Sequence, residues 1–133
     1  MKAAVDVLPG VWLVPAVQQA EFFSVLRSAD LLLNTSLSEG MCGSILEAMA
    51  LDTPVAARNI PGNAALVTQN ETGLLFDTPE EFVERAKALF ADRDQTTSIV
   101  RNAAAMVAKH HSPEVEQAAY RRIIAAALAA SSP

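Results

Sequence analysis

The chain has 133 residues, which suits one domain, and 51% of them are hydrophobic while 19% are charged. This composition supports a packed core and excludes a chain that is disordered by composition. The formal net charge of −5 argues against nucleic acid or an anionic membrane as the main partner, because both attract basic surfaces.

No run of about 18 apolar residues predicts a membrane span. The N-terminal segment MKAAVDVLPG makes a poor signal peptide, because Asp6 and Pro9 interrupt its apolar run. Cys42 is the single cysteine, so an internal disulfide is excluded. From these features we expect a cytoplasmic protein.

Short strands and helices alternate in the first part of the chain. Four brief apolar runs without polar alternation predict buried strands: 11–14 (VWLV), 31–33 (LLL), 55–57 (VAA) and 73–76 (GLLF). Apolar residues at helical spacing predict a helix over 18–28, another beginning near Gly43 or Ser44, and a short one over 63–68. The pattern is typical of a parallel sheet that helices cover on both faces.

The remainder of the chain is predicted to be helical. Thr78 supplies an N-cap, Pro79 the first helical residue and Glu81 a capping-box carboxylate. Further helices are predicted from about 94 to 109 and from 113 onward, and we expect the C-terminal AAALAASSP to be frayed. No repeat or linker divides the chain, so we expect residues 1–133 to form a single domain.

The segment 34–54 has the arrangement of an anion-binding site. A strand leads through a glycine-containing loop to a helix N-terminus, where free backbone N–H groups and the helix dipole favour negative charge. Glu39 in the loop and Glu47 in the helix stand beside it and suit hydroxyl groups, as in a sugar or ribose. Two alternatives are a capping carboxylate with a solvated glutamate, and the carboxylate pair of a glycosidase.

Ligands of open parallel sheets bind at the carboxyl ends of the strands. The Glu39 loop and the loop 59–63 both follow such ends, so we expect them to line one crevice. Arg58 ends a strand on the same side, where its guanidinium could meet a phosphate or pair with Glu39 or Glu47.

Two further chemistries receive less support from the residues. Cys42 could be a nucleophile at the helix start, but a small packing residue is the simpler interpretation. His110 and His111 with Glu114 have the residue types of a metal site. Adjacent histidines point to different sides of a helix, however, so we expect surface residues at a helix C-terminus.

The run SEGMCGSILEAMALDTPVAARNIPGN, with TGLLF after it, resembles the signature of retaining family 4 glycosyltransferases, the glycosyl transferases group 1 domain. HHSPEVEQAAYRRII resembles the closing helix of the same family. The resemblance implies a partial Rossmann-like donor domain of a GT-B fold, in which two such domains enclose the active site. It also implies a nucleotide-sugar donor, an acceptor that the sequence does not define, and no cofactor or metal.

By this resemblance, Glu47 would hold the ribose hydroxyls and Glu39 the transferred sugar. Backbone N–H groups of the neighbouring residues would meet sugar or diphosphate oxygens; the full set of expected donor-binding residues is Glu39, Gly40, Met41, Cys42, Gly43, Ser44, Glu47 and Arg58. Cys42 stands where the family usually has glycine and would crowd the donor slightly.

The resemblance covers only the C-terminal portion of the family's proteins. The acceptor domain and the first part of the donor domain are not matched, so we expect this chain to be inactive alone. A non-catalytic nucleotide-sugar-binding or regulatory module is the alternative. In the family's strand order, the two strands between the predicted strands 11–14 and 31–33 are lacking, so either the VWLV strand relocates or the exposed edge of strand 31–33 pairs elsewhere and favours self-association.

Overall fold

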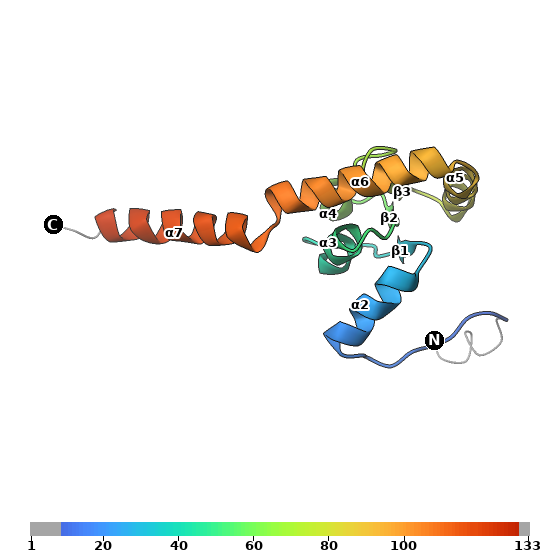
Figure 1. Cartoon of the computed structure of the whole chain (residues 1–133), viewed down its shortest axis with the longest axis horizontal. Helices are drawn as coiled ribbons and strands as arrows, with labels where there is room; N and C mark the ends of the chain where they lie inside the picture. The colour runs from blue at the N-terminus through green and yellow to red at the C-terminus, as the bar shows by residue number, and fades with distance from the viewer. Residues whose placement is uncertain (1–8, 131–133) are drawn as a thin grey trace.

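The computed structural model describes residues 9–130 (Figure 1). Its three strands are β1 (Leu32–Asn34), β2 (Val55–Arg58) and β3 (Leu74–Phe76). The helices, in chain order, are α2 (Gln19–Ser28), α3 (Gly43–Ala50), α4 (Pro61–Ala64), α5 (Pro79–Ala91), α6 (Arg93–His110) and α7 (Pro113–Ala130).

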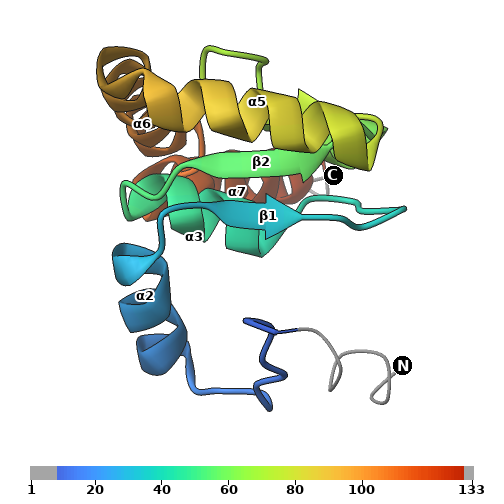
Figure 2. The same ribbon diagram turned by 90° about the vertical axis from the view of Figure 1, so that its right-hand side faces the viewer.

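The strands form one parallel sheet in the order β1-β2-β3. Helix α3 joins β1 to β2, which lie side by side in Figure 2, and α4 joins β2 to β3, as in Rossmann-like folds. All three strands therefore end at the same side of the sheet. The predicted α/β class, the parallel pairing and the last three predicted strands are confirmed.

The sheet has an apolar core on each face. β2 shows why, because its first three residues are all buried and alternate residues of a strand point to opposite faces. Val55 and Ala57 pack with α2, α3 and α6, while Ala56 packs with buried residues of β3, α5 and α6. The continuous burial of this strand thus confirms the expected helical cover on both faces.

Helix starts follow the sequence signals closely, with two local corrections. Thr78 caps α5, accepting a hydrogen bond from the backbone N–H of Glu81 at 3.2 Å. The Glu81 carboxylate accepts from Asp77 N–H at 2.9 Å instead of from the cap residue. The short helix predicted over 63–68 is displaced: α4 begins at Pro61, which is preorganised for the first helical position, and ends at Ala64, so residues 65–68 are not helical.

The strand predicted over residues 11–14 is wrong. These residues form no strand, and the Trp12 side chain is 80% exposed. A strand needs a partner ladder, and no described strand pairs with this run. Relocation of the VWLV strand is therefore not observed, and the sheet has three strands where we expected about four.

In the described part of the C-terminal segment that we expected to be frayed, helix α7 continues to Ala130, and residues 131–133 of that segment lie outside the described residues. Helix α7 projects away from the sheet (Figure 1), and none of its residues is buried. At its start the pKa of the Glu114 carboxyl is lowered, because that carboxylate accepts hydrogen bonds from its own backbone N–H and from Ser112. Among residues 9–130, no helix combines the length and the apolar character that crossing a bilayer requires.

The two edge strands of the sheet differ in whether their outward-facing backbone groups have hydrogen-bond partners. At β3, the outward-facing backbone of Leu75 is paired with side chains: its N–H donates to Gln69 Oε1 at 2.6 Å, and its carbonyl accepts from Arg85. At β1, Leu32 N–H donates to Pro54 O at 2.8 Å, so the alternate residue Leu33 directs its backbone groups away from β2. Within the described chain no strand pairs with that outer edge of β1.

Candidate functional site

The loops that follow β1 and β2 meet at the carboxyl side of the sheet, as predicted. A Cβ atom built on Gly62 would lie 2.2 Å from the carbonyl oxygen of Glu39, so only glycine fits there. Arg58, the last residue of β2, also joins the two segments, because its Nε donates a hydrogen bond to Thr35 O in the loop after β1 at 3.2 Å. The two loops therefore lie against each other, while the crevice that we expected them to line stays a prediction.

Beneath the loops lies a side-chain amide pair. Asn63 is fully buried, and its Nδ2 donates to Asn34 Oδ1 at 3.2 Å and to Arg58 O at 3.0 Å. Asn34 also donates to Cys42 Sγ at 3.2 Å. The motif search missed both asparagines, because their partners are 8 and 29 residues away from Asn34 and no local pattern reports such pairs.

Helix α3 begins between these loops with unoccupied backbone donors. Cys42 is its N-cap residue, and no side chain caps the helix. In the described structure the backbone N–H groups of Gly43, Ser44 and Ile45 have no hydrogen-bond acceptor. The first turn carries no acidic residue either, so its partial positive charge is available to an anion from outside the chain.

The two predicted carboxylates have different surroundings. Glu39 lies in the loop before α3, and its half-buried side chain has no hydrogen-bond partner in the described part of the chain. Glu47 is one turn into α3 and is also half-buried; its Oε1 accepts from Gln19 Nε2 of α2 at 3.4 Å. Gln19 is thus a neighbour that the sequence gave no reason to select.

Arg58 is positioned by neutral groups. Besides its bond to Thr35 O, its guanidinium carbon lies 5.9 Å from the centroid of the Phe76 ring. The ion pair considered with Glu39 or Glu47 is not formed; within residues 9–130 the ion pair that we observe is Arg85–Glu81, at 3.6 Å. The charge of Arg58 is therefore not neutralised by either carboxylate.

The remaining predicted site residues are either exposed or packed in the core. Met41 is 64% exposed and Gly40 is also exposed. Cys42 is buried, as expected for a packing residue, and its sulfur contacts Ser44 Oγ at 3.1 Å.

His110 ends α6 and lies exposed, like His111, which agrees with the expected surface positions at a helix C-terminus. The described residues contain no group of three or more His, Cys, Asp or Glu that could hold a metal ion.

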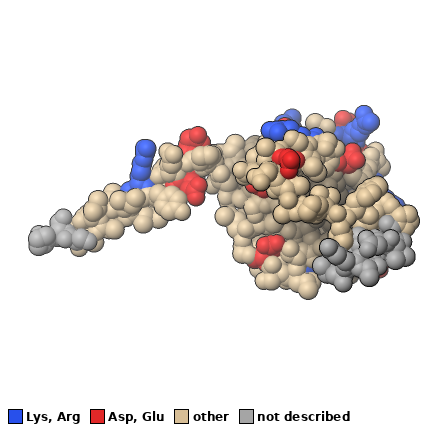
Figure 3. Space-filling view, turned by 90° about the horizontal axis from the view of Figure 1, so that it is seen from below, with Lys and Arg blue, Asp and Glu red and all other residues tan. Residues whose placement is uncertain are grey.

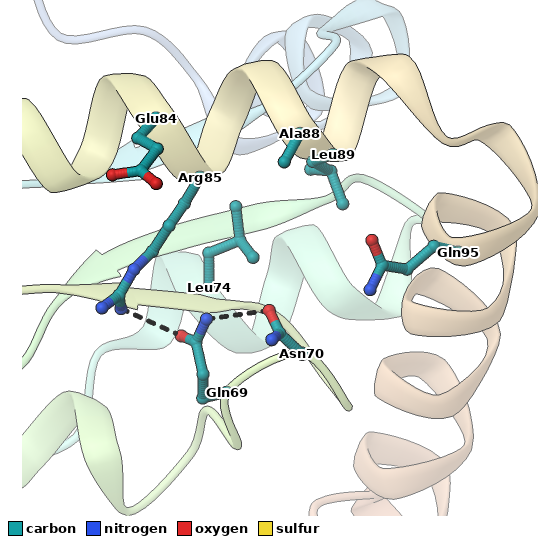
Figure 4. A pocket seen from close by; sticks show the side chains of 8 residues that line it. All are labelled: Gln69, Asn70, Leu74, Glu84, Arg85, Ala88, Leu89 and Gln95. Carbon is teal, nitrogen blue, oxygen red and sulfur yellow. Dashed lines mark hydrogen bonds between the residues drawn. The ribbon is translucent and has the colours of Figure 1, made fainter.

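A cavity of about 430 Å³ lies elsewhere, beside the β3 edge (Figure 4). Its polar wall includes Arg85 and Gln69, and these side chains already pair with each other and with the Leu75 backbone. We attribute this cavity to the closure of the sheet edge. The α3 N-terminus is the better candidate because its donors have no partners.

The sequence model described as "Glycosyl transferases group 1" matches residues 1–92. The chain belongs to the glycosyl transferases group 1 family. The matched range contains all eight residues that we expected to bind the donor. Family membership therefore agrees with the resemblance drawn from the sequence, and it covers both loops and α3.

Members of the glycosyl transferases group 1 family and solved structures extend this likeness. Glycosyltransferase 1 domain-containing protein 1 of Xenopus tropicalis is 44% identical over 117 residues, which are 88% of this chain and 34% of that protein. The chain thus spans about a third of this relative's length. The structure of Anabaena Alr3699/HepE with UDP-glucose has a TM-score of 0.69 at 24% identity, covering 76% of this chain and 29% of that one.

A C-terminal domain is also among the similar structures. That of the glycosyl transferase group 1 family protein LpcC of Francisella tularensis has a TM-score of 0.68 at 21% identity. The match covers 76% of this chain and 53% of that domain. These structural matches show that the fold is that of a Rossmann-like part of a GT-B glycosyltransferase.

Proposed function

We propose that this chain supplies the donor-binding part of a retaining glycosyltransferase, which transfers a sugar from a nucleotide-sugar donor to an acceptor. The observation that carries the proposal is the uncapped N-terminus of α3, where the backbone N–H groups of Gly43 and Ser44 have no acceptor among the described residues and neither residue is buried. A diphosphate or sugar oxygen would accept hydrogen bonds from these N–H groups. Family membership and the similarity to a protein solved with UDP-glucose support this ligand class.

Each predicted residue takes a role in this proposal. Glu47 would accept hydrogen bonds from ribose hydroxyls, and Glu39 from the transferred sugar. The backbone from Gly40 to Ser44 would donate to anionic and hydroxyl oxygens, which tolerates Met41 and Cys42 because their side chains are not needed. Arg58, whose charge neither glutamate neutralises, would offset part of the donor's negative charge.

The proposal includes retention of configuration and no bound metal or other cofactor. It also includes the expectation that residues 1–133 alone bind the donor without transferring its sugar, because an acceptor site must face the donor from another part of the protein. The chain covers 34% of the similar Xenopus protein, which leaves ample sequence there for such a part.

Calorimetric titration of UDP and GDP into the chain tests the proposal. We expect one of them to bind at micromolar to millimolar concentration, and Glu47→Ala to weaken that binding by about tenfold or more, since a hydrogen bond to a charged group contributes about 1.5–3 kcal/mol. Glu80→Ala is the matched control, an exposed glutamate on α5.

No heat of binding at millimolar UDP or GDP, with the chain folded by circular dichroism, would exclude the donor site. Transfer of sugar by the isolated chain would contradict its inactivity. Binding by a longer form of the protein that never transfers sugar would instead favour the non-catalytic module.

We also retain self-association through the outer edge of β1. Leu33 directs its backbone outward and its side chain is 42% exposed, and the apolar residues Val25 and Leu37 nearby in the sequence are more exposed still. Uncharged residues cover most of the described surface on the side seen in Figure 3. Light scattering after gel filtration should show a dimer that Leu33→Lys dissociates while Val83→Lys on α5 does not; a wild-type monomer at all concentrations would exclude it.

A further inference from the structure

The carboxamide of Asn34 joins three segments of the chain. It lies at the last residue of β1. Its Oδ1 accepts hydrogen bonds from the backbone N–H of Ser36 at 3.0 Å and from Asn63 Nδ2 at 3.2 Å. Its Nδ2 donates to Cys42 Sγ at 3.2 Å. One side chain therefore holds the start of the Glu39 loop, the N-cap residue of α3 and helix α4.

A purely local role would explain only one of these bonds. The bond between Oδ1 and the N–H two residues later is a common Asx turn, which needs no distant partner. The other two bonds span 29 and 8 residues. A carboxamide is the side chain that combines an oxygen able to accept from two donors with an N–H₂ donor. Aspartate would keep the acceptors and lose the donor, and leucine would lose both.

The buried Asn63 side chain has only two hydrogen-bond partners among the described residues, Asn34 and Arg58. The side chain is fully buried, and its Oδ1 has no hydrogen-bond partner among the described residues. Its Nδ2 bonds to Asn34 Oδ1 and Arg58 O are therefore what holds it. Freeing a buried donor is unfavourable, so the position of α4 is coupled to Asn34. Gly62, the preceding residue, touches the Glu39 carbonyl.

We infer that Asn34 is a positioning residue for the proposed donor site. It fixes the Glu39 loop against the α3 N-terminus on one side and against the Gly62 loop on the other, without contacting the ligand. The inference rests on the proposed function, because the loop that Asn34 holds is the one assigned to the sugar. Nothing in the family match assigns this role to either asparagine.

Two substitutions at this position separate positioning from simple packing. Asn34→Leu keeps the branched shape and the number of heavy atoms, in a somewhat larger side chain, and removes all three bonds, whereas Asn34→Asp keeps the two bonds at Oδ1. We expect Asn34→Leu to weaken UDP affinity by about tenfold and Asn34→Asp to weaken it by only about threefold, because aspartate keeps the two bonds at Oδ1 but loses the bond to Cys42 and adds a negative charge. Hydrogen exchange at the Ser36 amide should be faster by about tenfold in Asn34→Leu and close to wild type in Asn34→Asp.

The variant Asn63→Leu tests the link between the loops. If the asparagines act as one unit, it should weaken UDP affinity as much as Asn34→Leu does, and combining both should add little. Faster exchange at Ser36 in Asn63→Leu is expected as well: the turn can form without Asn63, but a carboxamide that Asn63 no longer holds should close it for a smaller fraction of the time. Unchanged UDP affinity in a folded Asn34→Leu variant would overturn the positioning role.

Exchange at Ser36 is measured without ligand, so the two proposals fail in different ways. If wild type does not bind UDP while Asn63→Leu still accelerates exchange at Ser36, the donor site fails and the link between the loops stands. If UDP binds and Asn63→Leu leaves both exchange and affinity unchanged, the donor site stands and the role of Asn34 is refuted.

Discussion

The contact between Gly62 and Glu39 predicts a large effect from adding one methyl group. In Gly62→Ala the new Cβ would lie 2.2 Å from Glu39 O, about 1.2 Å inside the 3.4 Å at which ordinary contact begins. The neighbouring atoms are Glu39 C at 2.8 Å and Gly40 O at 2.9 Å, all of them backbone. A flexible side chain could move aside at little cost, but here a loop must move.

We estimate that Gly62→Ala destabilises the fold by about 1–3 kcal/mol, the usual range for overpacking in a filled site. For a domain of this size that corresponds to a lower melting temperature by roughly 3–10 °C. The loop that must yield carries Glu39, so we expect weaker UDP binding as well. Gly43 has no atom within 4 Å of its built Cβ.

Thermal unfolding followed by circular dichroism measures the first effect and calorimetry the second. Gly43→Ala is the stability control, expected to melt within about 2 °C of wild type or slightly higher, because alanine favours the helix more than glycine does. If Gly62→Ala melts within 1 °C of wild type, the two loops do not touch as described and the reasoning is refuted.

Three substitutions test the supports of the sheet and helices. Arg85→Met removes the donor to Leu75 O at the β3 edge, and we expect a loss of about 1–2 kcal/mol in urea unfolding; no loss would mean that the edge is closed otherwise. Thr53→Val removes the buried hydroxyl that donates to Leu26 O at 2.8 Å, and should lower stability by about 1 kcal/mol while Thr97→Val does not. Thr78→Ala should cost about 1 kcal/mol as a lost N-cap, and an unchanged unfolding midpoint would contradict that role.

The local elements were largely predictable from the sequence, because their causes are local. Three brief apolar runs became β1, β2 and β3, and Thr78 with Pro79 marked the start of α5. The failures have tertiary causes. Residues 11–14 have strand composition and no strand beside them, and Val25 and Phe90, at core spacing on their helices, are 58% and 53% exposed because no described element covers them.

The residues of the candidate site also fall into those that the sequence could select and those that only the structure revealed. Glu39, Glu47 and the glycines were selected from spacing and from the family motif, because the chemistry of a helix N-terminus and its loop lies within one continuous segment. Asn34, Asn63 and Gln19 were not selected, because each acts through a partner on another element. Neither pattern nor motif states which distant side chains will meet.

The sequence by itself therefore determined the fold class, the order of most elements and the family, and it selected the segment for which we propose donor binding. The tertiary structure decided that the loops after β1 and β2 touch at Gly62, that an amide pair fastens them, and that one sheet edge is closed while the other is open. The physical reason is that hydrogen bonds and close packing between distant segments depend on three-dimensional position, whereas strand, cap and turn preferences depend on neighbouring residues.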